Sequence, residues 1–156
     1  MGLDQFLFKT KKEDTKRENQ VELMYWRKAN AIHKFFYDKC AEEGQEDYDT
    51  LSVNKEDLVE LIHLCQDVLF DLETCINIKT KEKVTDINGN EVEHEFTTYD
   101  SEVAREKLPT QGGFFFGSTE YNDYYKSYLT ETMTKLQGVV LETDWDNEDV
   151  WYYAWY

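Results

Sequence analysis

The spacing of hydrophobic and polar positions predicts a strand and two helices in the first half of the chain. Residues 3–8, LDQFLF, begin with alternation and end in aromatic residues, which suits a strand. Over residues 20–43 the apolar residues recur at helical spacing and fall on one broad arc, which predicts a long helix. Asn54 is a good N-cap for a second helix, because Glu56 and Asp57 follow in its first turn.

Residues 108–121, LPTQGGFFFGSTEY, set the most apolar run of the chain between two polar segments that contain glycine. The unbroken apolar run over residues 113–117 predicts a short central strand that is buried on both faces of a sheet. Ser118 or Thr119 is then expected to cap a third helix, and Gly138 to end it.

A hairpin is predicted at Asn88-Gly89, because this pair lies between arms rich in β-forming residues. The arms are polar on both faces, so we expect a protruding ribbon that buries little surface in the core. The aromatic residues 150–156 favour one more strand. The simplest assembly is a single α+β domain over residues 1–156. In it, a small mixed or antiparallel sheet of about three short strands is packed by three helices and carries the protruding β-hairpin.

Net charge is the strongest bulk signal, at −16, and it is unevenly distributed along the chain. Residues 1–39 carry a net charge of +3, residues 40–107 carry −13, and residues 108–156 carry −6. A surface this acidic repels nucleic acid and favours basic partners. The same charge also serves solubility alone, and the sequence does not choose between these two interpretations.

Length and composition indicate one cytoplasmic domain. The 156 residues are enough for a single core. No apolar run approaches the roughly 18 residues of a membrane-spanning helix, and LDQFLF is too short for the core of a signal peptide. The three cysteines form no CxxC pair and leave one over in any disulfide scheme, which favours reduced, buried thiols. We therefore expect a cytoplasmic protein with no membrane contact.

The chain resembles a family of small uncharacterised phage-encoded proteins in MGLDQFLFK, YWRKANAIHKFF, LPTQGGFFFGSTEYNDYY and its aromatic C-terminus. The match covers most of the chain, and residues 77–105, with the hairpin, look like a variable insertion. The final WYYAWY departs from the serine-tryptophan ending expected of relatives. The resemblance supplies no catalytic residues. It implies a phage accessory protein in the bacterial host cytoplasm, where such proteins often counter defences by sequestering nucleotide signals or by blocking a defence complex.

Lys28 is the most informative single position, because it falls inside the apolar arc of the helix predicted over residues 20–43. A buried ammonium needs a path to water, an acid from another segment or an anionic ligand. Trp26, Asn30 and His33 share a shoulder beside this arc. Their rings and amide suit stacking on a nucleobase and reading its edge. For any one of these residues, a place at the edge of the core is the more ordinary interpretation.

The two turns around the triple phenylalanine provide the other half of this predicted site. Thr110 and Gln111 precede a glycine pair whose backbone allows a ligand to approach closely. Ser118 and Thr119, together with the free amides of the third helix, would make an anion site at a helix N-terminus.

Two hypotheses for function follow, and both concern binding or sequestration rather than catalysis. The first is a pocket for a small anionic, nucleotide-like ligand. Its candidate ligand-binding residues are Trp26, Arg27, Lys28, Asn30, His33, Thr110, Gln111, Ser118 and Thr119. The second is an acidic mimic of nucleic acid, like an anti-CRISPR protein, that docks residues 40–107 on a basic groove of a host defence protein.

Catalytic and metal-binding motifs are not apparent in the sequence. His63 and Cys65 are two residues apart on a predicted helix and point in different directions, so they cannot chelate a metal together. The chain has neither a GxSxG nor a GxxxxGK[ST] motif. We therefore predict no metal and no other cofactor, and rank an enzyme last. The aromatic tail leaves pairing across a homo-oligomer open.

Overall fold

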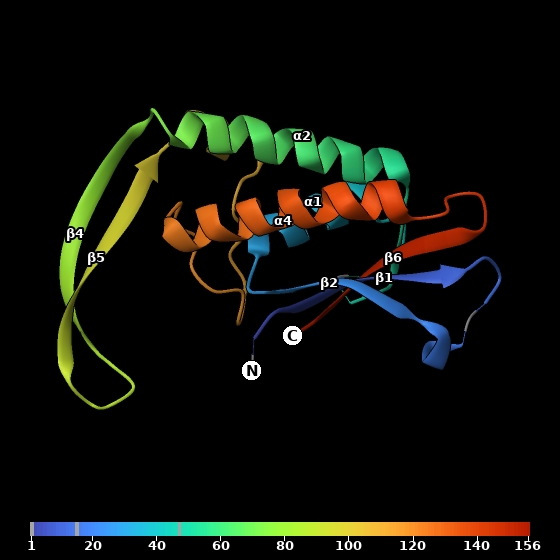
Figure 1. Ribbon diagram of the computed structural model, residues 1–156, viewed down its shortest axis with the longest axis horizontal. Helices are drawn as coiled ribbons and strands as arrows, with labels where there is room; N and C mark the ends of the chain where they lie inside the picture. The colour runs from blue at the N-terminus through green and yellow to red at the C-terminus, as the bar shows by residue number, and fades with distance from the viewer. Residues whose placement is uncertain (1, 15, 47) are drawn as a thin grey trace.

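A four-stranded antiparallel sheet, in the order β2-β1-β6-β3, forms one side of the domain (Figure 1). The computed structural model describes residues 2–14, 16–46 and 48–156. The strands of this sheet are β1 (Asp4–Lys11), β2 (Val21–Arg27), β3 (Leu51–Val53) and β6 (Glu148–Trp155). The first and last strands of the chain are therefore neighbours in the middle of the sheet.

Three long helices cover one face of this sheet and leave the other face open (Figure 1). The helical elements are the 3-10 turn η1 (Arg17–Asn19), α1 (Asn30–Cys40), α2 (Lys55–Leu72), α3 (Glu102–Lys107) and α4 (Asp123–Glu142). Helices α1 and α4 lie next to the sheet, and α2 lies beyond them. No helix in the described part of the chain combines the length and the apolar composition that crossing a membrane requires.

Alternation along the strands determines which side chains enter the core. Along β1, Gln5 and Leu7 are buried under the helices, whereas Phe6 and Phe8 lie on the open face and stay partly exposed. Tyr152 of β6 is buried and stacks on Phe36 of α1, with ring centroids 4.3 Å apart. The core therefore lies between the inner face of the sheet and the helices.

Helix α2 confirms the prediction of a helix after Asn54. The Asn54 side chain accepts from the backbone of Asp57, and the Asp57 side chain accepts from the Asn54 backbone N–H at 2.9 Å. This reciprocal pair is a capping box, which satisfies two amides at the start of the helix. A third helix is present as α4, but both of its predicted ends are wrong. Asn122 caps the helix instead of Ser118 or Thr119, and the helix continues through Gly138.

The helix predicted over residues 20–43 is wrong in its first half. Strand β2 occupies Val21–Arg27 and pairs with β1, placing Tyr25 opposite Phe6. The chain then turns at Lys28, which has a φ of +54° in the left-handed region, before α1 begins. Met24 and Trp26 both enter the core from the strand, because residues two apart on a strand point to the same face. Met24 fits the predicted helical arc as well, whereas Trp26 fits only the strand.

The strand predicted over residues 113–117 is also wrong. This segment is a loop in which the backbone N–H of Phe116 donates to the Gly113 carbonyl at 3.2 Å. Phe115 and Gly117 have positive φ values of +66° and +83°, which no strand permits. Only Phe116 is buried, and Phe114 is 83% exposed at the end of the loop.

The predicted hairpin is confirmed as a long ribbon of β4 (Ile76–Thr85) and β5 (Glu91–Asp100), which projects from the body of the domain (Figure 1). The prediction that both faces of the ribbon are polar is wrong, because its two faces differ. One face pairs Lys81 with Glu95 and Lys83 with Glu93, while the other carries exposed Ile78. The α+β class with a protruding hairpin is therefore confirmed, although the main sheet has four strands. That residues 77–105 vary between relatives stays a prediction.

Candidate functional site

Asn30 joins the two glycine-bearing turns to the start of α1. Its Nδ2 donates to the carbonyl oxygens of Phe116 at 3.0 Å and Ser118 at 2.9 Å, and its Oδ1 accepts from the backbone N–H of Gln111 at 3.0 Å. The Asn30 side chain is fully buried. The structure thus brings Asn30, Gln111 and Ser118 together, as predicted, but it directs their polar groups at one another rather than at a ligand.

Thr110 and Thr119 close the base of the same loop. The Thr110 hydroxyl donates to the Thr119 carbonyl at 2.7 Å, and the Thr110 backbone N–H donates to the Tyr121 hydroxyl at 3.2 Å. The Ser118 hydroxyl accepts from the Glu120 backbone N–H at 3.1 Å. Because α4 begins only after Asn122, its free amides do not add to an anion site at Ser118 and Thr119.

Lys28 lies beside this loop and is half-buried. Its stem packs against Gly117, where a Cβ atom would come within 3.1 Å of the Lys28 Cβ. The glycine is therefore needed both for its positive φ and for the close approach of the lysine. That the Lys28 ammonium meets an anion stays a prediction.

Trp26 and His33 cannot reach a ligand in this structure, so their predicted roles in stacking and edge reading are wrong. The Trp26 indole is only 3% exposed, and its Nε1 donates to the Thr132 hydroxyl of α4 at 2.8 Å. His33 is 1% exposed, with its Nδ1 2.9 Å from the Tyr152 hydroxyl. Both side chains belong to the core, because Trp26 points from β2 toward α4 and His33 points from α1 toward β6.

Arg27 lies on the opposite, open face of the sheet. Its Nη1 donates to the Asp4 carboxylate at 2.8 Å, and the Tyr25 hydroxyl donates to the same carboxylate. The hydrogen bond from Tyr25 is the main reason why the Asp4 pKa is lowered, and it raises the pKa of Tyr25 in return. None of five prominent hollows on the described surface is lined by any of the nine predicted site residues.

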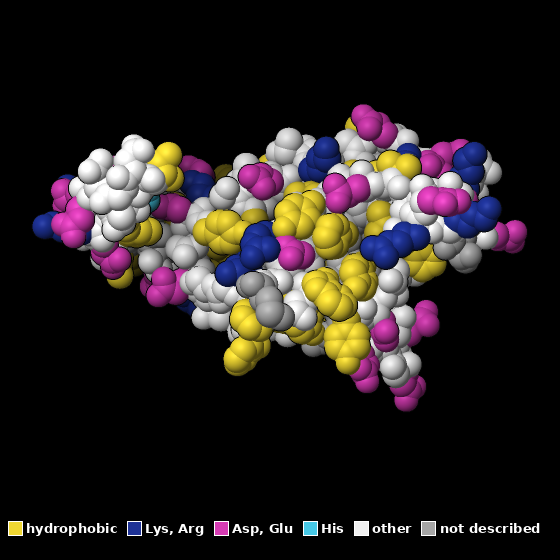
Figure 2. Space-filling model, turned by 90° about the horizontal axis from the view of Figure 1, so that it is seen from below, with side chains coloured by type: hydrophobic (Ala, Val, Ile, Leu, Met, Phe, Trp, Pro, Cys, Tyr) yellow, Lys and Arg dark blue, Asp and Glu magenta, His cyan; other side chains and the backbone are white. Residues whose placement is uncertain are grey.

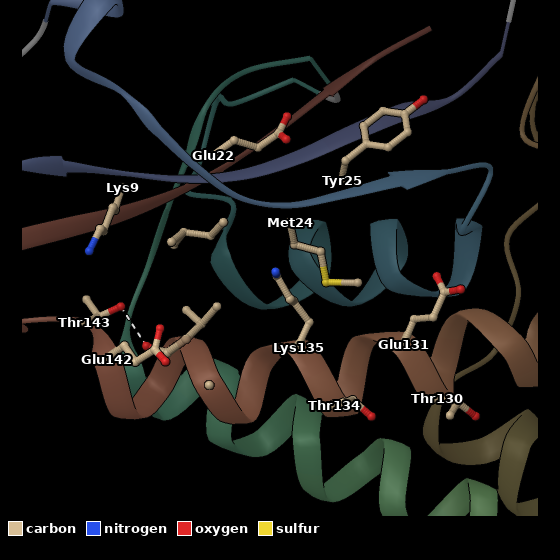
Figure 3. A pocket seen from close by; sticks show the side chains of 13 residues that line it. Lys9, Glu22, Met24, Tyr25, Thr130, Glu131, Thr134, Lys135, Glu142 and Thr143 are labelled. Atoms are coloured by element: carbon tan, nitrogen blue, oxygen red, sulfur yellow. Dashed lines mark hydrogen bonds between the residues drawn. The ribbon is translucent and has the colours of Figure 1, made fainter.

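A groove of about 840 Å³ lies instead between the free edge of β2 and helix α4 (Figure 3). Figure 3 shows Met24 pointing from β2 toward α4, and Glu131 and Lys135 pointing from α4 toward β2. Met24 and Val139 are buried at the base of the groove, which gives it an apolar floor under charged walls.

The walls of the groove carry more unpaired acids than bases. Glu22, Glu131 and Glu142 line the groove, and no ion pair involves them among the described residues. Lys135 is the one lining cation in the described part without an ion pair, since Lys9 lies 3.1 Å from Glu148. The groove therefore favours a positively charged occupant.

Gly138 leaves room on the α4 side of the groove. A Cβ atom at this position would meet nothing within 4 Å, so packing within the chain does not require a glycine here. Thr130 and Thr134 lie two turns and one turn before it on the same side of the helix and also line the groove. Glycine inside a helix costs about 1 kcal/mol relative to alanine. The small side chains allow another chain to approach α4 closely.

The free edge of β2 is less protected than the edges of β3 and β4. The opposite edge strand, β3, has only three residues, and β4 of the ribbon carries Lys79, Lys81 and Lys83. Short edge strands and lysines both discourage pairing with another chain. β2 has seven residues, and its protection is a bulge at Leu23, where the register with β1 shifts. Because the sequence predicts a helix over residues 20–43, it does not predict this edge strand. The alternation of Met24 and Trp26 along the chain is the signal that could have indicated it.

In the described part of the chain, no set of three or more His, Cys, Asp and Glu residues could hold a metal ion. Burial is the main cause that raises the pKa of Cys40 and of Cys65 to about 12. Both side chains are therefore protonated thiols at neutral pH, and a thiol is a poor nucleophile.

Comparisons with models of known protein families, with curated proteins and with solved structures find no match for this chain. The resemblance to phage-encoded proteins therefore stays a prediction, and the candidate site depends on the geometry of the chain's own residues.

Proposed function

We propose that this protein binds an extended, basic segment of a partner protein, which adds as a strand to the free edge of β2 above the groove. The observation that carries this proposal is the position of a seven-residue edge strand beside a groove of about 840 Å³. An edge strand presents a row of backbone N–H and C=O groups to a second chain. Binding by strand addition uses these groups for affinity and the neighbouring pocket for specificity.

The geometry of an added strand defines which partner side chains enter the groove. A new strand would lie about 4.8 Å from β2, and its alternate side chains would point toward α4. An apolar side chain there would contact Met24 and Val139 at the floor. Lysine or arginine side chains at the neighbouring inward positions would meet Glu131 and Glu142, which line the groove. These two acids are free to pair with them, since neither forms an ion pair among the described residues.

The charge of the whole chain supports a basic partner. At a net charge of −16, the protein attracts a basic segment over long range and accelerates its association. This attraction is screened by salt, with a Debye length of about 8 Å at physiological ionic strength. Contacts in the groove would therefore provide the specificity that charge alone does not.

We extend the proposal to the context implied by the resemblance to phage-encoded proteins. A phage accessory protein of this kind would act by sequestering a basic segment of a host defence protein, and so by binding rather than catalysis. This differs from a mimic of nucleic acid, because a local groove beside one edge strand is involved instead of the acidic surface over residues 40–107. It also differs from a nucleotide pocket at Asn30, whose polar groups are already satisfied within the protein.

A pair of substitutions at Gly138 tests the proposal. Because a Cβ atom at this position would meet nothing within 4 Å and Gly138 lines the groove, Gly138→Phe should place its ring in the groove, and Gly138→Ala should leave the groove open. The probe is a fluorescein-labelled twelve-residue peptide that alternates lysine with valine or threonine, and the measurement is fluorescence anisotropy. We expect binding to the wild type and to Gly138→Ala, and binding at least about tenfold weaker, or 1.4 kcal/mol, to Gly138→Phe.

Two controls separate strand addition from simple charge attraction. A peptide of the same charge with proline at every third position cannot add as a strand and should bind far more weakly. Glu131→Lys should weaken binding more than Glu106→Lys, which makes the same charge change on α3, outside the groove. Equal affinity of the alternating peptide for Gly138→Ala and Gly138→Phe, or equal binding of the proline peptide, would contradict the proposal.

A further inference from the structure

The open face of the sheet is aromatic where such a face is usually polar. Antiparallel sheets with one solvated face normally alternate apolar residues inward with polar residues outward. Here the outward positions of β1, β2 and β6 include six aromatic side chains: Phe6, Phe8, Tyr25, Trp151, Tyr153 and Trp155. Figure 2 shows hydrophobic side chains gathered over the sheet on this face, with charged side chains between and around them.

Three of these rings form a continuous row across three strands. The β-sheet register places Phe6 directly opposite both Tyr25 on β2 and Tyr153 on β6. The ring centroids of Phe6 and Tyr25 are 5.3 Å apart, and those of Phe6 and Tyr153 are 6.4 Å apart with the rings near parallel, at 27°. The rings support one another in a fixed arrangement, which provides a platform on which a planar group can stack.

A hollow of about 410 Å³ lies over one part of this platform, on the side of the sheet opposite α4. Phe6, Phe8 and Tyr153 form its aromatic floor. Its walls come from the segment between β1 and β2, which contributes Arg17, and from β2, which contributes Glu22. The volume falls in the range of about 300–1,000 Å³ that is typical of small-molecule sites.

The polar side chains around the floor offer both donors and acceptors. Arg17 only donates hydrogen bonds, Glu22 only accepts them as a carboxylate, and Gln20 and Thr50 do both. Arg17 and Glu22 line the same hollow, yet neither forms an ion pair with any described residue. An aromatic ring with donors and acceptors along its edge satisfies these groups, whereas a purely hydrocarbon ring would leave them unpaired.

We infer that this hollow binds a planar heteroaromatic ring of nucleobase size that carries an anionic group, as in a nucleoside monophosphate. The ring stacks on the floor formed by Phe8 and Tyr153, since stacking on aromatic side chains holds bases of any sequence. Glu22 and Gln20 contact the donors and acceptors of the ring edge. The guanidinium of Arg17 faces the phosphate, to which it can donate two parallel hydrogen bonds.

The local charge permits an anion here despite the acidity of the chain. Residues 1–39, which contain β1, η1 and β2, carry a net charge of +3, while the rest of the chain carries all of the acid surplus. Phosphate binding at Arg17 therefore takes place in the one basic stretch of the sequence. Glu22 lines both the groove and the hollow, but Arg17 and Tyr153 line the hollow and not the groove, so this inference is tested independently of the proposed function.

Isothermal titration calorimetry with adenosine 5′-monophosphate, adenosine and inorganic phosphate tests the inference. We expect the monophosphate to bind more tightly than adenosine, and inorganic phosphate alone to bind far more weakly than either. Tyr153→Leu should weaken binding of both adenosine and its monophosphate at least about tenfold, since a stacking surface is lost. Arg17→Gln should reduce affinity for the monophosphate to the level of adenosine and leave adenosine unchanged. Lys11→Gln is the matched control, because it removes one positive charge from the end of β1, outside the hollow, and should change nothing.

Arg17 lies on an exposed turn, so Arg17→Gln keeps the test valid if Tyr153→Leu fails to fold. Absence of binding by the monophosphates of all four common bases at millimolar concentration would overturn the inference. So would monophosphate binding that is unchanged in both Tyr153→Leu and Arg17→Gln, or inorganic phosphate that binds as tightly as the monophosphate. Binding of the basic peptide at the groove should be the same in these variants, so a failure here is distinct from a failure of the proposed function.

Discussion

Two regions on either side of β2 use polar and aromatic side chains in opposite ways. At the junction of β2 and α1, Asn30 and Trp26 are buried, and the hydrogen bonds of both side chains are made within the chain. Along the free edge of β2, Glu22 lies at the surface and forms no ion pair with any described residue. Buried polar groups need internal partners for stability. The capacity to bind another molecule therefore lies where the groups have not been paired internally.

The junction illustrates how a tight turn between a strand and a helix uses buried side-chain amides to bond backbone groups. Gln5 of β1 donates from Nε2 to the Ala29 carbonyl at 3.0 Å and accepts at Oε1 from the Ala29 backbone N–H at 2.9 Å. The chain turns here with Lys28 at a positive φ, and the Ala29 N–H finds its partner in the Gln5 side chain. The Ala29 carbonyl also accepts from the backbone N–H groups of Ile32 and His33 at the start of α1. Amide side chains such as those of Gln5 and Asn30 provide the missing partners, so their role is structural.

The largest expected effect is on stability, from Asn30→Ala. This change removes three hydrogen bonds and leaves the Gln111 N–H and two carbonyl groups without their buried partner. Since each unsatisfied buried group costs about 1–3 kcal/mol, we expect the free energy of unfolding to fall by about 3–5 kcal/mol. Urea unfolding followed by circular dichroism measures this change.

The control for Asn30→Ala is Asn19→Ala, because Asn19 is exposed and its Nδ2 donates to Asp14 at the surface, at 2.9 Å. It should change the free energy of unfolding by less than about 0.5 kcal/mol. The remaining folded Asn30→Ala protein should bind the basic peptide as the wild type does. Normal stability together with lost ligand binding in Asn30→Ala would show instead that the junction is the binding site.

Local signals in the sequence were enough to predict part of the fold. Asn54 with Asp57 determined the start of α2, and Asn88-Gly89 determined the turn of the ribbon, because a few neighbouring residues settle each structure. The prediction of a helix over residues 20–43 is wrong in its first half because Val21, Met24 and Tyr25 fit the helical arc, although this segment forms a strand. Pairing with β1 decides between the two, and this pairing is not encoded in local spacing.

For the candidate site, the sequence predicted which residues lie near one another but not which hydrogen bonds they form. The sequence correctly suggested that Asn30, Gln111 and Ser118 meet, since two glycine-bearing turns flank one apolar run. Their internal hydrogen bonds depend on exact backbone positions, which spacing does not reveal. The groove depends on β2 being at the edge of the sheet, and strand order arises from contacts between distant parts of the chain.

A smaller effect in the opposite direction is expected from Gly138→Ala. The groove side of α4 has open space at this position, so the added methyl group meets nothing within 4 Å. Alanine is the better helix former, and we expect the free energy of unfolding to rise by about 1 kcal/mol. Thermal unfolding measures it. Gly89→Ala is the matched contrast: at φ +81° alanine is strained, so the same change should lower stability. A loss of stability in Gly138→Ala would mean that the groove is not open at this point.

The smallest effect concerns the surface cluster of Asp4, Tyr25 and Arg27 on the open face. The Tyr25 hydrogen bond lowers the Asp4 pKa below its ordinary value of 3.8, so the cluster stabilises the fold above that pH and loses its effect as pH falls through the lowered value. The Tyr25 pKa is raised above 10.0, so the effect is also lost at strongly alkaline pH. Because the cluster is largely exposed, we expect it to contribute only a few tenths of a kcal/mol to the free energy of unfolding.

Urea unfolding from pH 2.5 to 7 should show the free energies of unfolding of wild type and Asp4→Asn converging in acid and separating toward neutrality. A gap between wild type and Asp4→Asn that stays constant down to pH 2.5 would show that Asp4 acts through packing rather than charge, and the open face would then be fixed by its rings alone.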